Sequence, residues 1–592
     1  MSRPGVKREA PVLDRSSRYL ILDGYVDEPA SLGVPPFISP QVRSLAGGLV
    51  AGGCQRDRIG YLTVDQWRSI KGRPEGIGSL GNLETLVIVT GCVVPGKYLR
   101  GTPISPREIR EVARETSDAT VIVAGPAADP SIEEDGLYLC RGDLGVLGEG
   151  ISSTGSVIDR DRTGEEWNEH LLQGAFLIWM HPDHPAPLIA EIETSRGCPR
   201  YISGGCSFCT EPKKGPVQFR EPERIIEEVR ELSSFGLENM RVGGQSDLLT
   251  YMSPEVGKSD VPVPDPSSIA EMLAGAREAL HGGKGVKRAV SNGRRLGIDT
   301  GIIHTDNANA NVAYSYPEET GKALRQIVDN TTAGTVLALG LESSDPGVRR
   351  INNLNAGIEE TLKAIRIMNE VGKHRGPNGL PHLLPGINFL GGLPGQTPES
   401  FQMDIRFLER VLESGLLVRR INIRGAIFKD DKGRPATPLL KGKLNRAFHL
   451  FKGRVRSEFD PIFLRNLIGE ASVLKGVYME TRTGHVRFGR QIGSYPILVG
   501  IEHEVEIGSF IDVAVTEFSS RSVTGFQTPF FINRMGFRDL QALPGVGKRR
   551  AADLFKRMPL TAGSLEETMG EVNGMQTIWS SIVSAGPCTY DG

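Results

Sequence analysis

The chain has 592 residues, of which 39% are hydrophobic and 24% are charged, and its net charge is −2. These globular values exclude a largely disordered chain, and the near-zero charge excludes a general attraction to nucleic acids or membranes, so any nucleic-acid surface must be local. The polar N-terminus lacks an apolar signal core, and no apolar run approaches about 18 residues, so we expect neither a signal peptide nor a membrane span. The length predicts several domains.

Residues 18–150 alternate between strand and helix patterns. Strands are expected at 19–22, 60–64, 86–90 and 119–124, and helices near 40–51 and 106–115. The alternation predicts an α/β fold with a parallel, doubly wound, Rossmann-like sheet. Ligands of such sheets bind at the carboxyl ends of the strands, here the loops 23–27 and 91–96. The region ends in a glycine-rich segment, Gly145–Gly150.

Three cysteines then lie within twelve residues, at Cys198, Cys206 and Cys209. They follow an apolar run, 187–192, that predicts a buried strand. Three thiolates can hold three corners of a [4Fe-4S] cluster and, with no fourth cysteine nearby, would leave one iron open to a substrate or cofactor. The alternative is a zinc site, which needs a fourth ligand, and the nearest upstream histidine is His184.

Strand, three-cysteine loop and helix in this order resemble the radical S-adenosylmethionine (SAM) superfamily. The resemblance implies that the open iron chelates SAM and that Phe208 lies near its adenine. Seven residues separate Cys198 from Cys206, more than the three usual in the family, whereas the two-residue gap before Cys209 fits.

The segment Gly145–Gly150 resembles the end of the cobalamin-binding-like domain that precedes many barrels of this family. Cobalamin is a possible but doubtful cofactor, because the first histidine of the chain is His170, which follows the N-terminal domain. The alternative is a degenerate Rossmann-like domain used for substrate binding or as a scaffold.

Residues 180–430 repeat the strand and helix pattern about six times. Strands are expected at 187–194, 239–244, 301–306, 335–342, 385–391 and 418–426. Helices are expected at 221–235, 266–281, 318–330, 358–371 and 398–414. The repeats predict a partial (β/α)6 barrel whose chemistry lies at the carboxyl ends of the strands.

Several strand ends of this region resemble the SAM-binding segments of the family. The turn after the second strand resembles the one that receives the SAM amino group, with a glutamine in place of the usual acid. The fourth strand ends in a segment similar to the family's Gly-x-Glu-Ser, although a helix-capping role for Ser343 or Asp345 is the alternative. The resemblance implies SAM contacts by Gly243, Gly244, Gln245, Glu342, Ser343, Asn388 and Arg424.

The C-terminal third contains features typical of nucleic-acid binding. A basic linker or helical region, 431–480, interleaves lysine and arginine with Phe448 and Phe451, which could stack on bases; a surface helix with a basic face is the alternative. Residues 481–527 alternate like β-strands and resemble the small RNA-binding TRAM barrel.

The last predicted domain, 530–592, contains a segment that closely resembles a helix-hairpin-helix motif. Its glycines would let backbone N–H groups reach a phosphate, and the basic residues beside them would add charge. The residues concerned are Gly545, Gly547, Lys548, Arg549 and Arg550. A protein–protein or purely structural hairpin is the alternative.

The layout as a whole resembles tRNA methylthiotransferases. It implies an enzyme that cleaves SAM to a 5′-deoxyadenosyl radical and modifies an RNA, either tRNA or rRNA, with a one-electron donor such as ferredoxin or flavodoxin. Methylthiotransferases carry further N-terminal cysteines for a second cluster, whereas Cys54, Cys92 and Cys140 lie far apart here, so general RNA modification is favoured over sulfur insertion.

Two alternatives remain open at this point. One is a cobalamin-dependent radical SAM enzyme that acts on a small molecule or a protein. The other is a non-enzymatic RNA-binding iron–sulfur protein. The scattered remaining cysteines predict no disulfide framework, so a reducing cytoplasm is the expected location.

Overall fold

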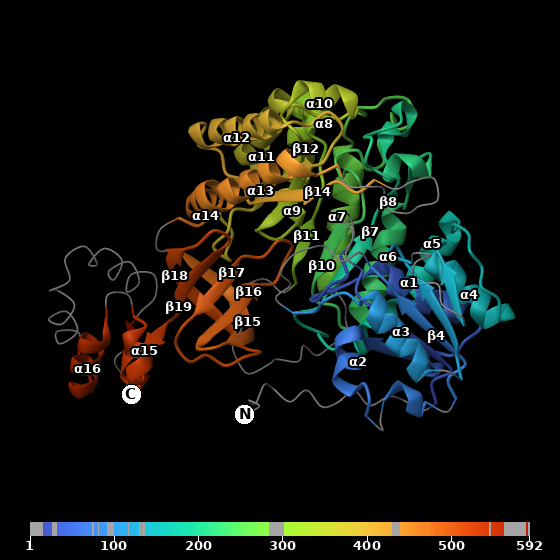
Figure 1. The fold of residues 1–592 in the computed structure, drawn as a ribbon, viewed down its shortest axis with the longest axis horizontal. Coiled ribbons are helices and arrows are strands. Elements are labelled where there is room, and N and C mark those ends of the chain that lie inside the picture. Colours follow the sequence, from blue (N-terminus) through green and yellow to red (C-terminus); the bar gives the residue numbers. More distant parts are fainter. Residues whose placement is uncertain are drawn as a thin grey trace.

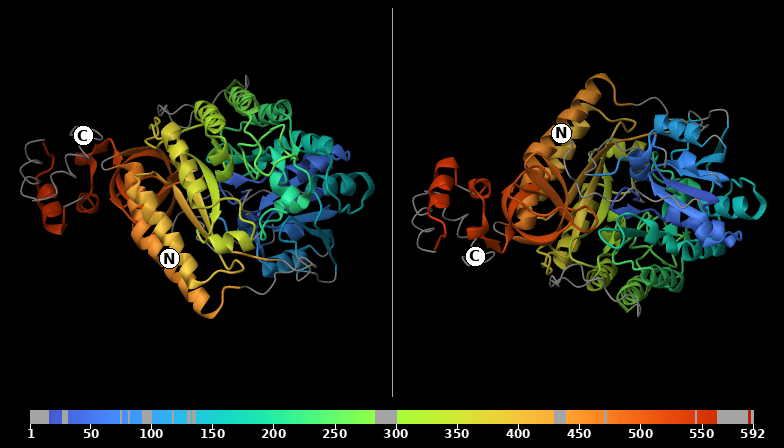
Figure 2. Two further views of the ribbon diagram at one scale, coloured as in Figure 1. Left: turned by 90° about the horizontal axis from the view of Figure 1, so that it is seen from above. Right: turned by 90° about the horizontal axis from the view of Figure 1, so that it is seen from below.

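The computed structural model describes residues 16–26, 32–73, 76–80, 82–91, 100–116, 118–128, 132, 136–282, 301–428, 439–469, 472–543, 546–561 and 588–589. The N-terminal domain lies beside a central parallel half-barrel, a small β-barrel follows, and a C-terminal helix pair projects from one end (Figures 1 and 2). No helix in the described part of the chain is long and apolar enough to cross a membrane.

The N-terminal domain contains a five-stranded parallel sheet in the order β3-β1-β4-β5-β6. Its strands are β1 (Tyr19–Asp23), β3 (Ile59–Thr63), β4 (Thr85–Val89), β5 (Thr120–Ala124) and β6 (Leu137–Cys140). Its helices are α1 (Pro40–Ala51), α2 (Val64–Ile70), α3 (Pro106–Glu115), α4 (Leu144–Thr154) and α5 (Gly164–Gln173). The predicted Rossmann-like sheet is therefore confirmed, with β6 as an additional edge strand.

The glycine-rich segment Gly145–Gly150 lies within α4 and packs against α1. A Cβ atom on Gly48 would lie 1.9 Å from the carbonyl oxygen of Gly145, and one on Gly148 would lie 2.4 Å from that of Leu45. Only glycine permits such a close approach of two helix backbones. The segment therefore has a packing role between helices.

The central half-barrel has six parallel strands in two sheets, β7-β10-β11 and β12-β13-β14, and the short strand β2 (Phe37–Ile38) of the N-terminal region is added to the first sheet beside β7. Its strands are β7 (Ile189–Glu193), β10 (Met240–Gly243), β11 (Ile303–Thr305), β12 (Thr335–Glu342), β13 (Leu383–Gly391) and β14 (Arg420–Gly425). The sheets meet where Thr305 N donates to Thr335 Oγ1 (2.9 Å) and Ala308 N donates to the carbonyl oxygen of Ala338 (3.0 Å). The outer helices are α6 (Pro222–Ser234), α7 (Pro266–Gly282), α9 (Pro317–Asn330), α11 (Ile358–Gly372) and α12 (Pro398–Glu413).

Two contacts join the N-terminal domain to the half-barrel. The short strand β2 (Phe37–Ile38) pairs in parallel with β7 and extends its sheet. Beside it, Arg43 of α1 donates to Glu228 Oε1 of α6 (2.5 Å), and Arg220 donates to Glu228 Oε2 (2.5 Å). All three side chains are buried. The two domains are therefore held by a continuous sheet and a buried ionic cluster.

The helices α13 (Gly442–Arg454) and α14 (Asp460–Ile468) precede the small barrel, and α13 packs against α12. Phe448 and Phe451 are buried, and the Phe451 ring stacks on that of Phe401 at 5.6 Å. The prediction that these rings could stack on bases is therefore wrong: they anchor the helix, and the basic side chains lie on its outer face.

The small barrel is closed, with strands in the order β15-β16-β17-β19-β18. They are β15 (Val473–Thr483), β16 (Val486–Gln491), β17 (Leu498–Ile501), β18 (Phe510–Phe518) and β19 (Ser522–Thr528). The first strand begins at Val473, before the start of the predicted range 481–527. Beyond it, α15 (Phe537–Gln541) and α16 (Lys548–Lys556) pack around Leu540, Ala551 and Leu554.

Candidate active site

The three cysteines of the loop after β7 are half-buried free thiols. Burial raises the pKa of each thiol, that of Cys209 to about 12. The thiols also act on one another, because Cys206 raises the pKa of Cys198, and both raise that of Cys209. Sulfur donors so close together suit an iron–sulfur cluster, whose irons would keep them as thiolates.

The loop is held against the residues that follow helix α10 (Pro346–Ile351). Arg200 donates to Cys206 Sγ (3.1 Å) and to Asn353 Oδ1 (3.0 Å), and Asn353 Nδ2 donates to the carbonyl oxygen of Gly205 (2.9 Å). Ser207 Oγ donates to Asn352 Oδ1 (2.7 Å). These partners were not predicted, because they lie about 150 residues away in sequence; the left-handed backbone at Asn353 (φ 48°) is the only local signal.

The structure does not support the zinc alternative. His184 bonds through Nε2 to the carbonyl oxygen of Phe235 (2.8 Å) and lies next to Gly236. Within the described ranges, no three histidine, cysteine, aspartate or glutamate side chains converge on a point that could hold one metal ion. A cluster spreads its thiolates over several iron atoms and does not require that convergence.

The turn after β10 is tightly constrained, and its glutamine is hydrogen-bonded within the protein; the SAM contacts of Gly243, Gly244 and Gln245 stay predictions. Gly244 has a φ of 77°, and a Cβ atom on Gly243 would lie 2.0 Å from Glu191 Oε1, so both positions require glycine. The Gln245 side chain is buried, and its Nε2 donates to the carbonyl oxygen of Asp306 (2.8 Å). It therefore ties β10 to β11, and the amide is already engaged.

Glu342 lies between Arg424 and the cysteine loop. Burial raises the pKa of its carboxyl to about 8, although Arg424 opposes this shift, and Glu342 in turn raises the pKa of Cys206. Its φ of 63° is unusual for a residue that is not glycine. Strained backbone around a buried carboxyl is typical of functional sites, so Glu342 remains the leading polar candidate at this mouth.

Ser343 and Asp345 have the capping geometry that was the alternative. The Ser343 hydroxyl accepts from Asp345 N (3.3 Å), and Asp345 accepts from Gly347 N (2.8 Å) as the N-cap of α10. Ser343 is also buried. The contact of Ser343 with SAM therefore stays a prediction, while its contact with the next turn is observed.

Asn388 and Phe208 lie on the same side of the half-barrel. Asn388 stands opposite Asn422 of β14, whose Nδ2 donates to Asn388 Oδ1 (2.8 Å). Phe208 and Cys206 pack against Val348, Leu354 and Leu393, together with Leu390. An apolar, partly open surface thus borders the cysteine loop at the place where the resemblance puts adenine.

The carboxyl edge of the N-terminal sheet is occupied by bonded side chains. Tyr61 OH donates to Asp23 Oδ2 (2.8 Å), and the pKa of Asp23 is raised to about 6 by burial. His170 is buried and lies 3.0 Å from Glu149 through Nε2, and the His181 ring lies 6.1 Å from that of Tyr61. Both histidines follow the N-terminal domain in sequence, and the domain has no histidine of its own, so cobalamin stays a possible but doubtful cofactor. The loop 92–99, with Cys92, lies outside the described residues.

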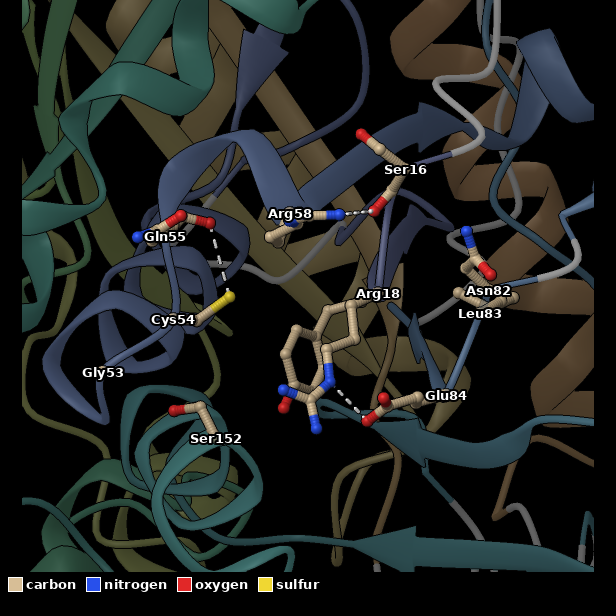
Figure 3. Close-up of a pocket in the computed structure, with 11 residues that line it drawn as sticks. Ser16, Arg18, Gly53, Cys54, Gln55, Arg58, Asn82, Leu83, Glu84 and Ser152 are labelled. Carbon is tan, nitrogen blue, oxygen red and sulfur yellow. Dashed lines mark hydrogen bonds and ion pairs between the residues drawn. The ribbon is translucent and has the colours of Figure 1, made fainter.

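A cavity of about 730 Å³ lies at the opposite edge of this sheet (Figure 3). Figure 3 shows Arg18 and Glu84 next to each other in its lining, joined as an ion pair with Arg18 Nε 2.5 Å from Glu84 Oε2. The Cys54 thiol lies 3.4 Å from the carbonyl oxygen of Gln55. Cys54 therefore lies at the amino ends of the strands, away from the three-cysteine loop.

The predicted nucleic-acid residues lie around the start of α16. Gly547 is the N-cap, Lys548 and Arg549 are exposed, and Arg550 is partly buried. Gly545 lies outside the described residues. The exposed pair therefore places positive charge beside the first-turn N–H groups of a helix, a suitable arrangement for phosphate.

Part of the chain matches a known protein family, and several known proteins are similar to it. The model of the radical SAM superfamily matches residues 192–408. An uncharacterized protein of Methanocaldococcus jannaschii is 36% identical over 530 residues, covering 86% of this chain and 93% of the relative. The ribosomal protein uS12 methylthiotransferase RimO of Thermus thermophilus is 26% identical over 223 residues, covering 37% of this chain and 42% of the relative. The structure of the radical SAM methyltransferase TsrM from Kitasatospora setae is 14% identical, covering 69% of this chain and 73% of that chain, with a TM-score of 0.42.

Proposed function

Because the chain belongs to the radical SAM superfamily, we propose that it modifies a nucleotide of an RNA, either tRNA or rRNA, through reductive cleavage of SAM. Its cofactors are those of the superfamily, a [4Fe-4S] cluster and SAM. The RNA substrate, a donor such as ferredoxin or flavodoxin, and the cytoplasmic location are parts of the proposal.

Different residues at the mouth of the half-barrel would have different roles in this reaction. Cys198, Cys206 and Cys209 would hold the cluster, which supplies the electron that cleaves SAM. Arg200 donates a hydrogen bond to Cys206 Sγ, which lowers the electron density on that sulfur. The apolar surface around Phe208 keeps water away from the same place.

Glu342 supplies a group that can hold or release a proton near neutral pH, because burial raises its pKa to about 8. Arg424 is the cation that favours the charged form. A bound SAM carries a positively charged sulfonium group and would favour the same form. We therefore assign Glu342 to SAM binding, with the carboxyl losing its proton as SAM enters.

The observation that supports an RNA substrate is the charged end of α16. Lys548 and Arg549 are exposed behind the N-cap Gly547, on a helix pair that projects beyond the small barrel (Figure 2). Such groups contact phosphates without reading sequence, so they would position an RNA and not choose its base. The aromatic side chains of α13 are buried in the core and cannot stack on bases. The proposed RNA contact therefore depends on α16.

Mass spectrometry of nucleosides from total tRNA and rRNA tests the proposal. A deletion strain would be compared with strains that carry the wild-type chain, Cys206→Ala, or the control Cys54→Ala. A nucleoside absent from the deletion and Cys206→Ala strains, but present with Cys54→Ala, is the expected result. Unchanged nucleosides in all four strains would refute an RNA substrate; a modified ribosomal protein or cobalt in the purified enzyme would then identify the rival substrate or cofactor.

A further inference from the structure

A loop of the small barrel enters the interior of the central half-barrel. Between β16 and β17, Ser494 N donates to His304 Nδ1 of β11 (2.8 Å). A Cβ atom on Gly493 would lie 2.4 Å from the His304 ring, so the approach is as close as a glycine allows. Tyr495, at the tip, has a left-handed backbone (φ 51°). These contacts thus hold the loop in one position inside the half-barrel.

The Tyr495 side chain connects two strands of the half-barrel that are not neighbours. Its hydroxyl donates to the Asp306 carboxylate, with oxygen distances of 3.0 and 3.2 Å. The Arg420 guanidinium of β14 lies over its ring, 4.4 Å from the centroid. Arg419 donates to its backbone carbonyl oxygen. One residue of the small barrel therefore contacts both the end of β11 and the start of β14.

The strand register shows that Tyr495 lies beneath the site and does not line it. Arg420 stands opposite Gly386, Asn422 opposite Asn388, and Arg424 opposite Leu390. Each pair of residues advances about 6.6 Å along a strand, so Arg420 lies about 13 Å below Arg424. Tyr495 accordingly acts on the upper layer only through the side chains between them.

Two series of hydrogen bonds lead toward the site from the side chains that contact Tyr495, and we call them branches. In the first, Arg420 Nε donates to Asn422 Oδ1 (2.6 Å), and Asn422 Nδ2 donates to Asn388 Oδ1 (2.8 Å). This branch reaches the strand that borders the adenine-side surface.

The second branch starts at Asp306, which also pairs with Arg241. The carbonyl oxygen of Asp306 accepts from Gln245 Nε2 (2.8 Å), and Asn307 Nδ2 donates to the carbonyl oxygen of Gln245 (2.9 Å). This branch fixes the Gly243–Gln245 turn. Both strands with predicted SAM contacts are therefore tied to Tyr495, β13 through the ring and its contact with Arg420, and the turn after β10 through the hydroxyl and its bond to Asp306.

We propose that Tyr495 is a positioning residue of the SAM site: the small barrel supplies the floor of the half-barrel and, through this phenol, sets the geometry of Asn388 and of the Gly243–Gln245 turn. The inference rests on the proposed use of this site for SAM. It assigns the small barrel a part in the active site in addition to any contact with RNA. Buried networks of this kind are strongly coupled, so loss of the hydroxyl directly affects the Asp306 branch, and loss of the whole side chain affects both branches.

The test uses the full-length enzyme with its cluster, as wild type, Tyr495→Phe and the control Tyr478→Phe. Tyr478 lies on β15 of the same barrel, with its ring 5.1 Å from that of Phe510. Iron content and thermal midpoint are measured first. SAM is then titrated against the electron paramagnetic resonance spectrum of the reduced cluster.

We expect Tyr495→Phe to keep the iron content and the spectrum without SAM, and to need about tenfold more SAM for half-conversion, which corresponds to about 1.4 kcal/mol. Tyr478→Phe should match the wild type. A wild-type midpoint in Tyr495→Phe, or an affinity lost only in proportion to folded protein, would overturn the inference. A wild-type enzyme that does not bind SAM would instead refute the SAM site itself, and the inference with it.

A double-mutant cycle keeps the test decisive if Tyr495→Phe is poorly folded. The cycle combines Tyr495→Leu, which removes the ring over which Arg420 lies, with Arg420→Met. If the ring acts through Arg420, the SAM midpoints of Tyr495→Leu and of the double variant should be close to each other. Effects that simply multiply would show that the two residues act independently, contrary to the inference.

Discussion

Replacing Glu228 by glutamine should weaken the junction between the N-terminal domain and the half-barrel. The carboxylate lies between two buried guanidiniums, those of Arg43 and Arg220, each 2.5 Å away. Glu228→Gln keeps the shape but leaves both cations buried without their anion. Removing one partner of a buried ion pair typically costs about 3–5 kcal/mol. We expect a loss of that size in the first unfolding transition.

Urea unfolding followed by tryptophan fluorescence measures this loss, because the Trp167 ring lies 5.8 Å from the Arg220 guanidinium. Glu227→Gln on the same helix is the matched control. Its partner is Arg224 (2.9 Å), and both side chains are largely exposed, so the change should cost less than about 1 kcal/mol. Equal losses in the two variants would refute the reasoning, because burial would then have made no difference.

The same pair of variants has a defined pH dependence. Burial alone would raise the pKa of Glu228, but Arg220 and Arg43 outweigh it and lower the pKa below its ordinary value of 4.5. The stability that the carboxylate contributes is therefore complete above that value and is lost as pH falls through the lower, folded pKa. The difference between wild type and Glu228→Gln should thus shrink in acid.

Two further predictions concern the cysteine loop. Cys209→Ala should abolish the visible absorption and the bound iron, whereas Cys140→Ala, in the N-terminal sheet, should keep both; retained iron in the first variant would exclude Cys209 as a ligand. Arg200→Met removes a positive charge and the bond to Cys206 Sγ, so the cluster's reduction potential should become more negative in a redox titration. The exposed control Arg224→Met should leave the potential unchanged.

The parallel sheets and the cysteine loop could be predicted because their signals are local. Alternation of apolar runs with amphipathic helices fixes a parallel α/β arrangement whatever the distant contacts are. Three cysteines on one loop likewise gather without help from the rest of the chain. The edge strand β6 (Leu137–Cys140) was not predicted, because its run of four residues is short.

The role of a residue was harder to predict where the same type of side chain can serve either in packing or in ligand binding. Phe448 and Phe451 alternate with basic residues, a pattern that fits a base-stacking surface. Their spacing of three residues also fits one buried face of a helix, and in the structure both rings are buried. Gln245 occupies the place of a ligand residue in the motif, but its amide is used to join β10 to β11. A motif fixes where a residue lies on its strand, while its partners come from strands elsewhere.

Strand β14 contained a local signal for the floor of the site. Arg420, Asn422 and Arg424 alternate with isoleucines, and helices cover the outer face of the half-barrel, so these polar side chains must point inward. The sequence analysis used Arg424 but not Arg420. Asn422 donates to Asn388 and accepts from Arg420 Nε, so one polar contact of Arg420 comes from its own strand. The alternation could have shown that Arg420 points inward, but only the fold shows that a tyrosine of the next domain lies against its guanidinium, because that contact joins residues 75 positions apart in sequence.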